Sequence, residues 1–389
     1  MSEPIFIARQ DTLEQEILPA HWLAQYKLFG EESYTFQDKG IWKKLCMSSA
    51  AANDRDIHAE ALEEMLTTFS AEHTGKWMLT VYGMDAAALE GLATMAAIAE
   101  SGTAMAAVAG NALLMHAIAN SETAMQRIAN SQTAMQRVAN NRGAMDAIGR
   151  SRIARDAVQA SPYYNSCIKE NDMAIAKLAV ALANLESAGY SGMAGVAADS
   201  TAMTAVAASS VARNAISASP YYDEKIKEND MAIAKLVVGF ANLESAGYSG
   251  MAGVAADSTA MTAVAASSTA MTAVAASATA MGKIAAVDAA LSKLAASTTA
   301  MDALYARKKK LNGGSASKSG KFIILEISAS NAFNTSKYGY ATLSDGSKPD
   351  WSSYLAKYAF FQKYPKYATY MLNDTDSDDY IYYFDIASP

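Results

Sequence analysis

The chain has 389 residues, a net charge of −7 at pH 7 and 51% hydrophobic residues, with alanine the most frequent. A single hydrophobic core rarely organises more than about 250–300 residues, so we expect several domains or an elongated array. The negative charge disfavours general binding to nucleic acid, because phosphate contacts need a basic surface. No run of about 18 large apolar residues is present, and we therefore expect no membrane insertion.

Residues 1–85 predict an N-terminal helical module that caps the rest of the chain or attaches it to a partner. Aromatic residues are frequent in this segment and include Trp22, Trp42 and Trp77, which suffice for a compact core. The stretch DIHAEALEEMLTTF, which begins at Asp56, places its large apolar residues on one side of a helix.

Residues 86–305 repeat a ten-residue phrase, as in SETAMQRIAN from Ser121 and SQTAMQRVAN from Ser131. Met is followed by Val or Ile three positions later and by Ala four positions later, which is one face of a helix. A residue with a short polar side chain stands four positions before the Met, where it can accept hydrogen bonds from the first-turn N–H groups. These residues are Ser101, Asn111, Ser121, Ser131, Asn141, Ser151, Asp199, Ser209, Asp257, Ser267, Ser277 and Ser297. The pattern predicts one helix of about eight residues in each phrase.

Two architectures compete for this array. A continuous coiled coil fits poorly, because a ten-residue period requires about 3.3 residues per turn and left-handed supercoils use about 3.5. Helices of eight residues are unstable alone, so we predict that they stack their Met and Val faces into a solenoid, with Met in the core rather than in a metal or cofactor site. Asn120, Asn130 and Asn140 directly precede three of the capping residues, and we expect them in the left-handed conformation that ends helices.

A longer repeat is superimposed on the array. Residues 161–218 return as residues 219–276, a shift of 58, and 44 of the first 50 paired positions are identical. Each of these two cassettes begins with a Ser-Pro turn and contains a longer apolar helix around DMAIAKL. Cys167 of the first cassette is replaced by Lys225 in the second, which argues against a repeated thiol or metal role.

The composition changes after the array. NGGSASKSGK predicts a linker over residues 306–320, and the basic run that starts at Arg307 is interpreted as the cationic end of a helix. Residues 321–389 contain KFIILEI and YIYYFDI, whose β-branched and aromatic residues predict strands in an α+β or β-rich tip domain.

The tip is rich in Tyr, which predicts a binding surface. A rigid ring offers contact area, and hydroxyls and carboxylates offer hydrogen bonds, which suits a sugar ligand. The alternative is that the segment caps the array or serves as an oligomerisation foot. The acidic stretch DTDSDD favours a solvated turn over a calcium loop, because the Gly and Glu of such loops are missing. The predicted binding residues are Tyr338, Tyr340, Trp351, Tyr354, Tyr380, Tyr382, Asp376 and Asp378.

We expect no enzyme activity, metal or cofactor. The chain has four histidines, and neither they nor the two cysteines show the spacing of metal ligands or of a catalytic group.

The phrase STAMTAVAAS at 200–209 and 268–277 and the tip sequence GKFIILEISASNAFNTS from Gly320 complete the pattern. Together with the N-terminal module they resemble the tail-fibre and appendage proteins of tailed bacteriophages. The resemblance implies a structural virion protein, made in the host cytoplasm and usually a homotrimer. Its N-terminal module would bind other tail proteins and its tip a host-surface glycan or protein. The alternative is a helical-repeat scaffold for protein binding, or a connector protein without receptor binding.

Overall fold

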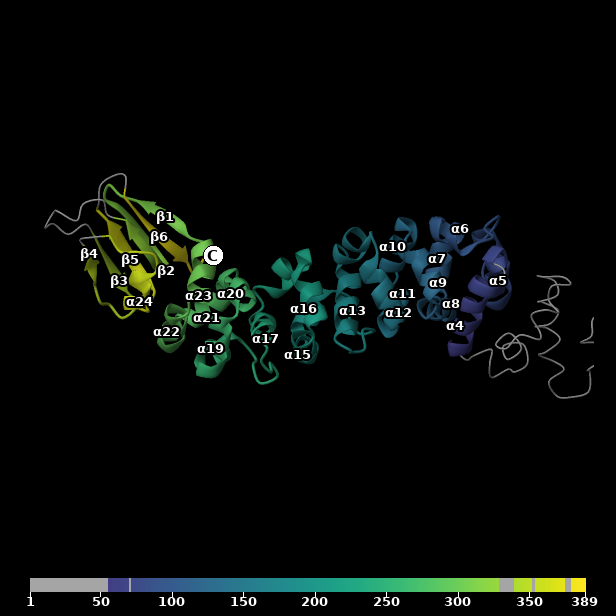
Figure 1. The fold of residues 1–389 in the computed structure, drawn as a ribbon, viewed down its shortest axis with the longest axis horizontal. Coiled ribbons are helices and arrows are strands. Elements are labelled where there is room, and N and C mark those ends of the chain that lie inside the picture. Colours follow the sequence, from purple (N-terminus) through teal and green to yellow (C-terminus); the bar gives the residue numbers. More distant parts are fainter. Residues whose placement is uncertain (1–54, 70, 329–338, 352–353, 375–378) are drawn as a thin grey trace, which may run out of the picture. The chain divides into compact units, whose positions relative to one another are not determined.

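The structure is a computed structural model that describes residues 55–69, 71–328, 339–351, 354–374 and 379–389 (Figure 1). The chain divides into two compact units, Met1–Gly192 and Met193–Pro389. This division lies inside the first cassette, whereas the sequence predicts boundaries at residues 85 and 305. Both units are built from short helices, and the second ends in a six-stranded antiparallel sheet. The predicted class, a mainly helical array of short repeats with a β-rich C-terminal domain, is confirmed.

The first described element of the first unit is the amphipathic helix that the sequence predicts at Asp56. Of the three tryptophans that the sequence predicts in an N-terminal core, Trp77 is buried. Trp22 and Trp42 lie outside the described residues. The elements of this unit are α4 (Arg55–Glu64), η5 (Met65–Phe69), η6 (Ala71–His73), α5 (Thr74–Val81), η7 (Ala86–Ala88), α6 (Met95–Glu100), α7 (Gly102–Gly110), α8 (Ala112–Ala119), α9 (Glu122–Ala129), α10 (Gln132–Ala139), α11 (Arg142–Arg150), α12 (Arg152–Ala160), η8 (Tyr164–Lys169) and α13 (Asp172–Leu182).

The second unit resumes the array and adds the sheet. Its helical elements are α14 (Met193–Ala198), α15 (Ser200–Ala208), α16 (Ser210–Ser217), η9 (Tyr222–Ile226), α17 (Asp230–Phe240), α18 (Met251–Ala256), α19 (Ser258–Ala266), α20 (Ser268–Ala275), α21 (Ala278–Ala285), α22 (Asp288–Ala296), α23 (Thr298–Ala306) and α24 (Ala359–Lys363). Its strands are β1 (Lys309–Asn312), β2 (Ala316–Ser328), β3 (Gly339–Leu343), β4 (Asp350–Trp351), β5 (Ala368–Asn373) and β6 (Tyr380–Asp385).

The array is a solenoid in which each helix packs on the third element after it. In the first unit α7 contacts α10, α8 contacts α11 and α9 contacts α12; in the second unit α17 contacts α20 and α20 contacts α23. Three elements therefore complete one turn of the solenoid, and the Met and Val faces of successive turns meet inside. Met105, Met135 and Met271 are fully buried, as the sequence predicts.

All twelve predicted capping residues occupy the N-cap position of a helix and accept a hydrogen bond from a first-turn N–H group. Several serines have a second function that the sequence does not show. The Ser131 Oγ accepts from the Ala134 N–H at 3.2 Å and donates to the Ala99 carbonyl at 2.8 Å, 32 residues earlier. Ser151, Ser161 and Ser297 donate to a carbonyl at the same separation. Each of these hydroxyls thus joins two turns of the solenoid.

Replacing Ser131 by Ala should lower the local stability of the array by about 2 kcal/mol, since both the cap and the bond to the buried Ala99 carbonyl are lost. Ser101→Ala is the matched control: its Oγ accepts from the Ala104 N–H at 3.3 Å and donates to no other turn of the described array, so we expect a cost of about 1 kcal/mol. Hydrogen exchange of peptides that cover α7 and α10 measures both costs. Equal costs would contradict the joining role of Ser131.

The corners between helices differ from the prediction. Asn120, Asn130 and Asn140 have φ angles of −105°, −91° and −88°, so none of them is left-handed. The extended capping residue that follows each asparagine redirects the chain, and the corner needs no positive φ. The amide of Asn140 instead donates to the Gln136 carbonyl at 2.8 Å.

The cassettes continue the ten-residue spacing further than their sequence indicates. Ser161 begins a phrase in which the π-helical turn η8 replaces the α-helix, and Asn171 then caps α13. Only the segment after α13, which contains Ser187, departs from the repeat.

Each cassette buries one lysine on its long helix. The Lys177 ammonium donates to the Asp146 carboxylate at 2.5 Å and to the Ser187 carbonyl at 2.9 Å. The equivalent Lys235 donates to the Ser245 carbonyl at 3.2 Å, and the position that corresponds to Asp146 is Thr204. Burial lowers the pKa of Lys235, and the Glu244 charge opposes this shift only in part.

The sheet of the second unit covers the end of the array, against α22 and α23 (Figure 1). Its strand order is β1-β6-β2-β5-β3-β4, and β2 pairs with β5 through its first half and with β6 through its second half. Ile323, Leu325 and Phe384 share one core with the last array helices, whereas Phe322 and Ile324 belong to a second core inside the sheet domain.

Residues 306–320, which the sequence predicts as a linker, instead contain β1 and the beginning of β2. The glycines of NGGS occupy the turn between these strands. Ion pairs attach the sheet domain to the array, between Lys357 and Asp302 at 3.0 Å and between Lys366 and Asp288 at 2.8 Å. The C-terminal segment thus packs on the last array helices as a cap, which is the alternative given for it in the sequence analysis.

Among the described residues no single helix has both the length and the apolar composition of a membrane span; α7 and α8 reach them only when taken together, across a bend of 100°.

Candidate functional site

Strand β6 and the end of α23 form a cluster of aromatic and basic side chains at the surface. Tyr305 ends α23, Lys310 lies on β1, and Tyr380 and Tyr382 lie on β6. Lys310 is paired with Tyr382 in the register of the sheet. Because side chains alternate along a strand, Tyr380, Tyr382 and Phe384 share one face of β6, and Phe384 fixes that face against the array core. We name Tyr305, Lys308, Lys310, Tyr380 and Tyr382 the tyrosine–lysine patch.

The rings of the patch contact one another. The Tyr380 and Tyr382 centroids are 4.5 Å apart, and Tyr305 meets Tyr382 edge-to-face at 5.9 Å. The Lys308 ammonium lies 4.1 Å from the Tyr305 centroid and 5.0 Å from that of Tyr382, and Lys310 lies 4.9 Å from the Tyr380 centroid. Attraction between each ammonium and the ring face holds both lysines in place.

One carboxylate lies beneath the patch. Glu326 is only 8% exposed and accepts a hydrogen bond from the Tyr305 hydroxyl at 2.5 Å. Burial and this carboxylate raise the pKa of Tyr305, and the same two causes raise the pKa of Tyr380. Both phenols therefore remain protonated at neutral pH and can act as hydrogen-bond donors.

The eight predicted binding residues do not form one site. Tyr380 and Tyr382 belong to the patch, and Tyr354 is 53% exposed. Tyr338, Asp376 and Asp378 lie outside the described residues. Trp351 is 3% exposed and packs in the inner core against Phe360 at 6.0 Å, so its prediction as a binding residue is wrong. Its indole lies over Gly339, which leaves no room for a Cβ.

Tyr340 lies on a different part of the sheet. Strand β3 is separated from β6 by β2 and β5, a distance of about 14 Å across three strand spacings. Tyr340 contacts Tyr370 at 5.7 Å beside a hollow of about 310 Å³ that Lys348, Asp350 and Asp374 also line.

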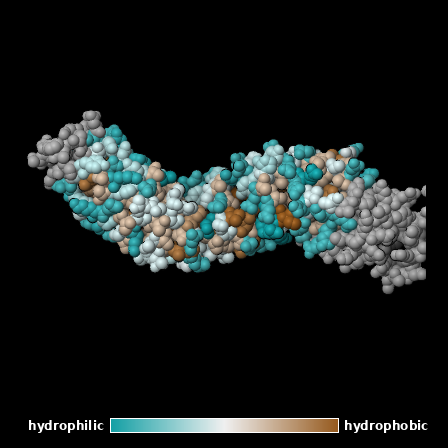
Figure 2. All heavy atoms as spheres, viewed as in Figure 1, coloured by the Kyte–Doolittle hydropathy of each residue, from teal (hydrophilic) through white to brown (hydrophobic). Residues whose placement is uncertain are grey.

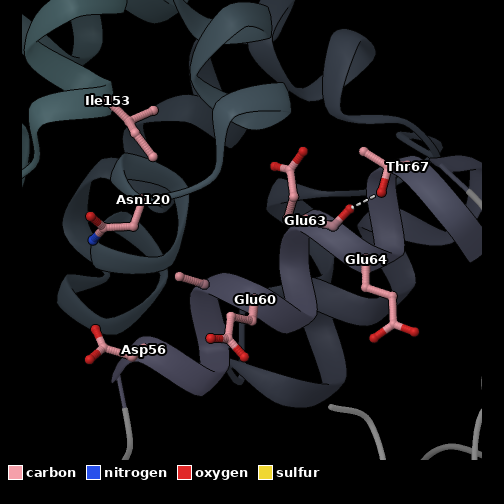
Figure 3. Close-up of a pocket in the computed structure, with 8 residues that line it drawn as sticks. Asp56, Glu60, Glu63, Glu64, Thr67, Asn120 and Ile153 are labelled. Atoms are coloured by element: carbon pink, nitrogen blue, oxygen red, sulfur yellow. Dashed lines mark hydrogen bonds between the residues drawn. The ribbon is translucent and has the colours of Figure 1, made fainter. Parts of the chain in front are cut away.

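The first unit has a larger acidic hollow of about 740 Å³ beside α4, lined by Asp56, Ala59, Glu60, Glu63, Glu64, Thr67, Asn120 and Ile153 (Figure 3). Glu63 has a structural function there, because its carboxylate accepts from the Ser121 hydroxyl at 2.5 Å and from the Thr123 N–H at 3.1 Å. Glu63 and the N-cap residue Ser121 thus cap α9 together. In the described part of the chain, no group of three His, Cys, Asp or Glu side chains could hold a metal ion.

Sequence reasoning missed Tyr305, Lys308 and Lys310. It interpreted the basic run as the cationic end of a helix, but α23 ends at Ala306 and only Arg307 occupies its C-cap. The basic residues and the YIYYFDI tyrosines are about 70 positions apart, and only the pairing of β1 with β6 brings them together.

No protein-family model matches the chain, and a search among curated proteins finds no match.

Proposed function

We propose that this chain is a structural appendage protein of the tail-fibre class that its repeats resemble. In this proposal the solenoid is a spacer, and its sheet-capped C-terminal end contacts a glycan or protein on the host surface. Residues 1–85 would bind other virion tail proteins, and the chain would act as a homotrimer without enzyme activity.

The observation that carries the proposal is the tyrosine–lysine patch at the array end. The cap needs Phe384 and its neighbours for packing, but Lys310 is exposed and the two rings on β6 are only partly buried. Aromatic side chains with polar tips are typical of recognition surfaces.

The scaffold alternative has less support. A peptide-binding solenoid needs large side chains exposed along its array, and among the described array residues only Ile153 and Val211 are large apolar residues with exposed side chains. On the face drawn in Figure 2 the hydrophobic residues appear as separate spots among paler and hydrophilic atoms.

Immunogold labelling of purified virions tests the proposal. Antibodies against the sheet domain should label the outer end of an appendage, and antibodies against residues 1–85 should label the end near the particle. The reverse order would make the C-terminus the anchor, and particles without label would contradict the virion assignment.

A further inference from the structure

We propose that the tyrosine–lysine patch binds an acidic saccharide, in which the sugar ring stacks on the tyrosines and its carboxylate or phosphate meets Lys308 and Lys310. The inference deepens the proposed function, since it takes the sheet domain as the contact end and names the chemistry of its ligand.

The rings provide the stacking surface. Tyr380 and Tyr382 are neighbours on one face of β6, and their centroid separation of 4.5 Å is comparable with the size of one sugar ring. Phe384 on the same face is buried in the array core, so the strand carrying both rings is fixed before a ligand arrives. Such preorganisation reduces the entropy lost on binding.

Lys308 and Lys310 give the patch two positive charges. Within the described residues no carboxylate lies within ion-pair distance of Arg307, Lys308 or Lys310. Lys309 differs, because it lies 3.7 Å from Asp385, on the opposite face of β1. The ammonium groups over the tyrosine rings can still donate hydrogen bonds to an anion, because a cation–π contact with a ring face is not a full N–H hydrogen bond.

Other ligand classes fit less well. Among the residues that the structure describes, the carboxylate that contacts the patch is Glu326. It is buried and accepts from Tyr305, so it is not placed to bind the hydroxyls of a neutral sugar. Nucleic acid is disfavoured because the chain carries a charge of −7 and the patch has only two lysines. Typical DNA-binding proteins make about 6–10 phosphate contacts.

Calorimetric titration of the full chain tests the inference. The probe is a tetrasaccharide that alternates glucuronate and N-acetylglucosamine, and its neutral control is the tetrasaccharide of N-acetylglucosamine alone. We expect the acidic probe to bind at least fivefold more tightly, with an affinity that falls as salt is added. N-acetylglucosamine 6-phosphate and inorganic phosphate are titrated in parallel. Tighter binding of either acidic sugar supports the inference and identifies the anion, whereas phosphate alone binding as well as both sugars would overturn it.

Two variants locate the site. Lys308→Gln and Lys310→Gln should each weaken binding of the acidic probe about five- to tenfold, the loss expected for one charge-assisted hydrogen bond at a partly exposed site. Lys363→Gln is the matched control, because its ammonium also lies over a tyrosine ring, that of Tyr364 at 5.2 Å, but outside the patch. Equal binding by all three variants, or equal binding of the acidic and neutral probes, would overturn the inference.

The two proposals fail separately. If virions carry the chain as an appendage but no acidic sugar binds, the ligand assignment is wrong and the appendage remains. If acidic sugars bind but virions lack the chain, the appendage is wrong and the patch remains a saccharide site.

Discussion

Replacing Asp146 by Ala should destabilise the first unit by about 3 kcal/mol at pH 7, because the change leaves a buried ammonium without its carboxylate. Lys177 is fully buried, and Asp146 is its one ion-pair partner among the described residues. Its remaining acceptors are the Ser187 carbonyl at 2.9 Å and the Ala188 carbonyl at 3.4 Å. Hydrogen exchange of peptides covering α11 and α13 measures the loss.

The second buried lysine, Lys235, provides the control. Thr204 corresponds to Asp146 by the same shift of 58 residues that relates Lys235 to Lys177, so Thr204→Ala removes no charge and should change stability by less than about 0.5 kcal/mol. If Asp146→Ala costs as little as Thr204→Ala, the ion pair does not stabilise the first unit.

The reciprocal change, Thr204→Asp, should stabilise the second unit and alter its dependence on pH. Burial lowers the pKa of Lys235 in the folded chain, whereas the pKa of a lysine in the unfolded chain is about 10.4. Between these two values the unfolded chain binds more protons, so the stability of the second unit rises with pH until the unfolded lysine has titrated. A carboxylate at position 204 raises the folded pKa and should remove this rise. Exchange rates, each divided by the free-peptide rate at the same pH, test the prediction, which fails if the two pH profiles coincide.

Replacing Gly239 by Ala should destabilise the second unit by about 2 kcal/mol, although alanine favours helix. A Cβ at Gly239 would lie 2.4 Å from the Ala207 carbonyl oxygen and 3.0 Å from the Ala207 Cβ. Both atoms belong to α15, which packs on α17, so the two helices must separate to admit the methyl group. Local exchange in α15 and α17 reports the change.

Gly282→Ala is the matched control, because it also lies within an array helix but a Cβ there meets no atom within 4 Å. That variant should be more stable by about 0.5–1 kcal/mol. The equivalent contact in the first unit has the opposite pair, with Gly149 facing Ala181, so adding Ala207→Gly to Gly239→Ala should restore part of the lost stability. If Gly239→Ala stabilised the second unit as much as Gly282→Ala, the contact between α15 and α17 would have room for a methyl group.

The candidate site was predictable only in part. The density of Tyr in the last segment indicates a surface with recognition chemistry, and Tyr380 and Tyr382 do lie in the patch. Trp351 belongs to the same aromatic-rich segment but lies in the core. Whether a strand residue is buried depends on which face of the sheet is covered by other elements, and the amino-acid composition does not show this. The predicted carboxylates, Asp376 and Asp378, lie outside the described residues. The structure places two side chains that were not predicted, Lys308 and Lys310, over the tyrosine rings.

The sequence by itself determined local features of the array: the approximate length of its repeated helices, the twelve predicted N-cap residues and the face that carries Met135 or Met271. These follow from the helix period and from the first-turn N–H groups, which are satisfied within a few residues. Only the tertiary structure decided that each helix stacks on the third one after it, that Ser131 also bonds to the Ala99 carbonyl, and that β1 carries Lys310 to the tyrosines of β6. These contacts join residues that are tens of positions apart, and a periodic sequence presents the same apolar face to every possible partner, so its pattern cannot select one.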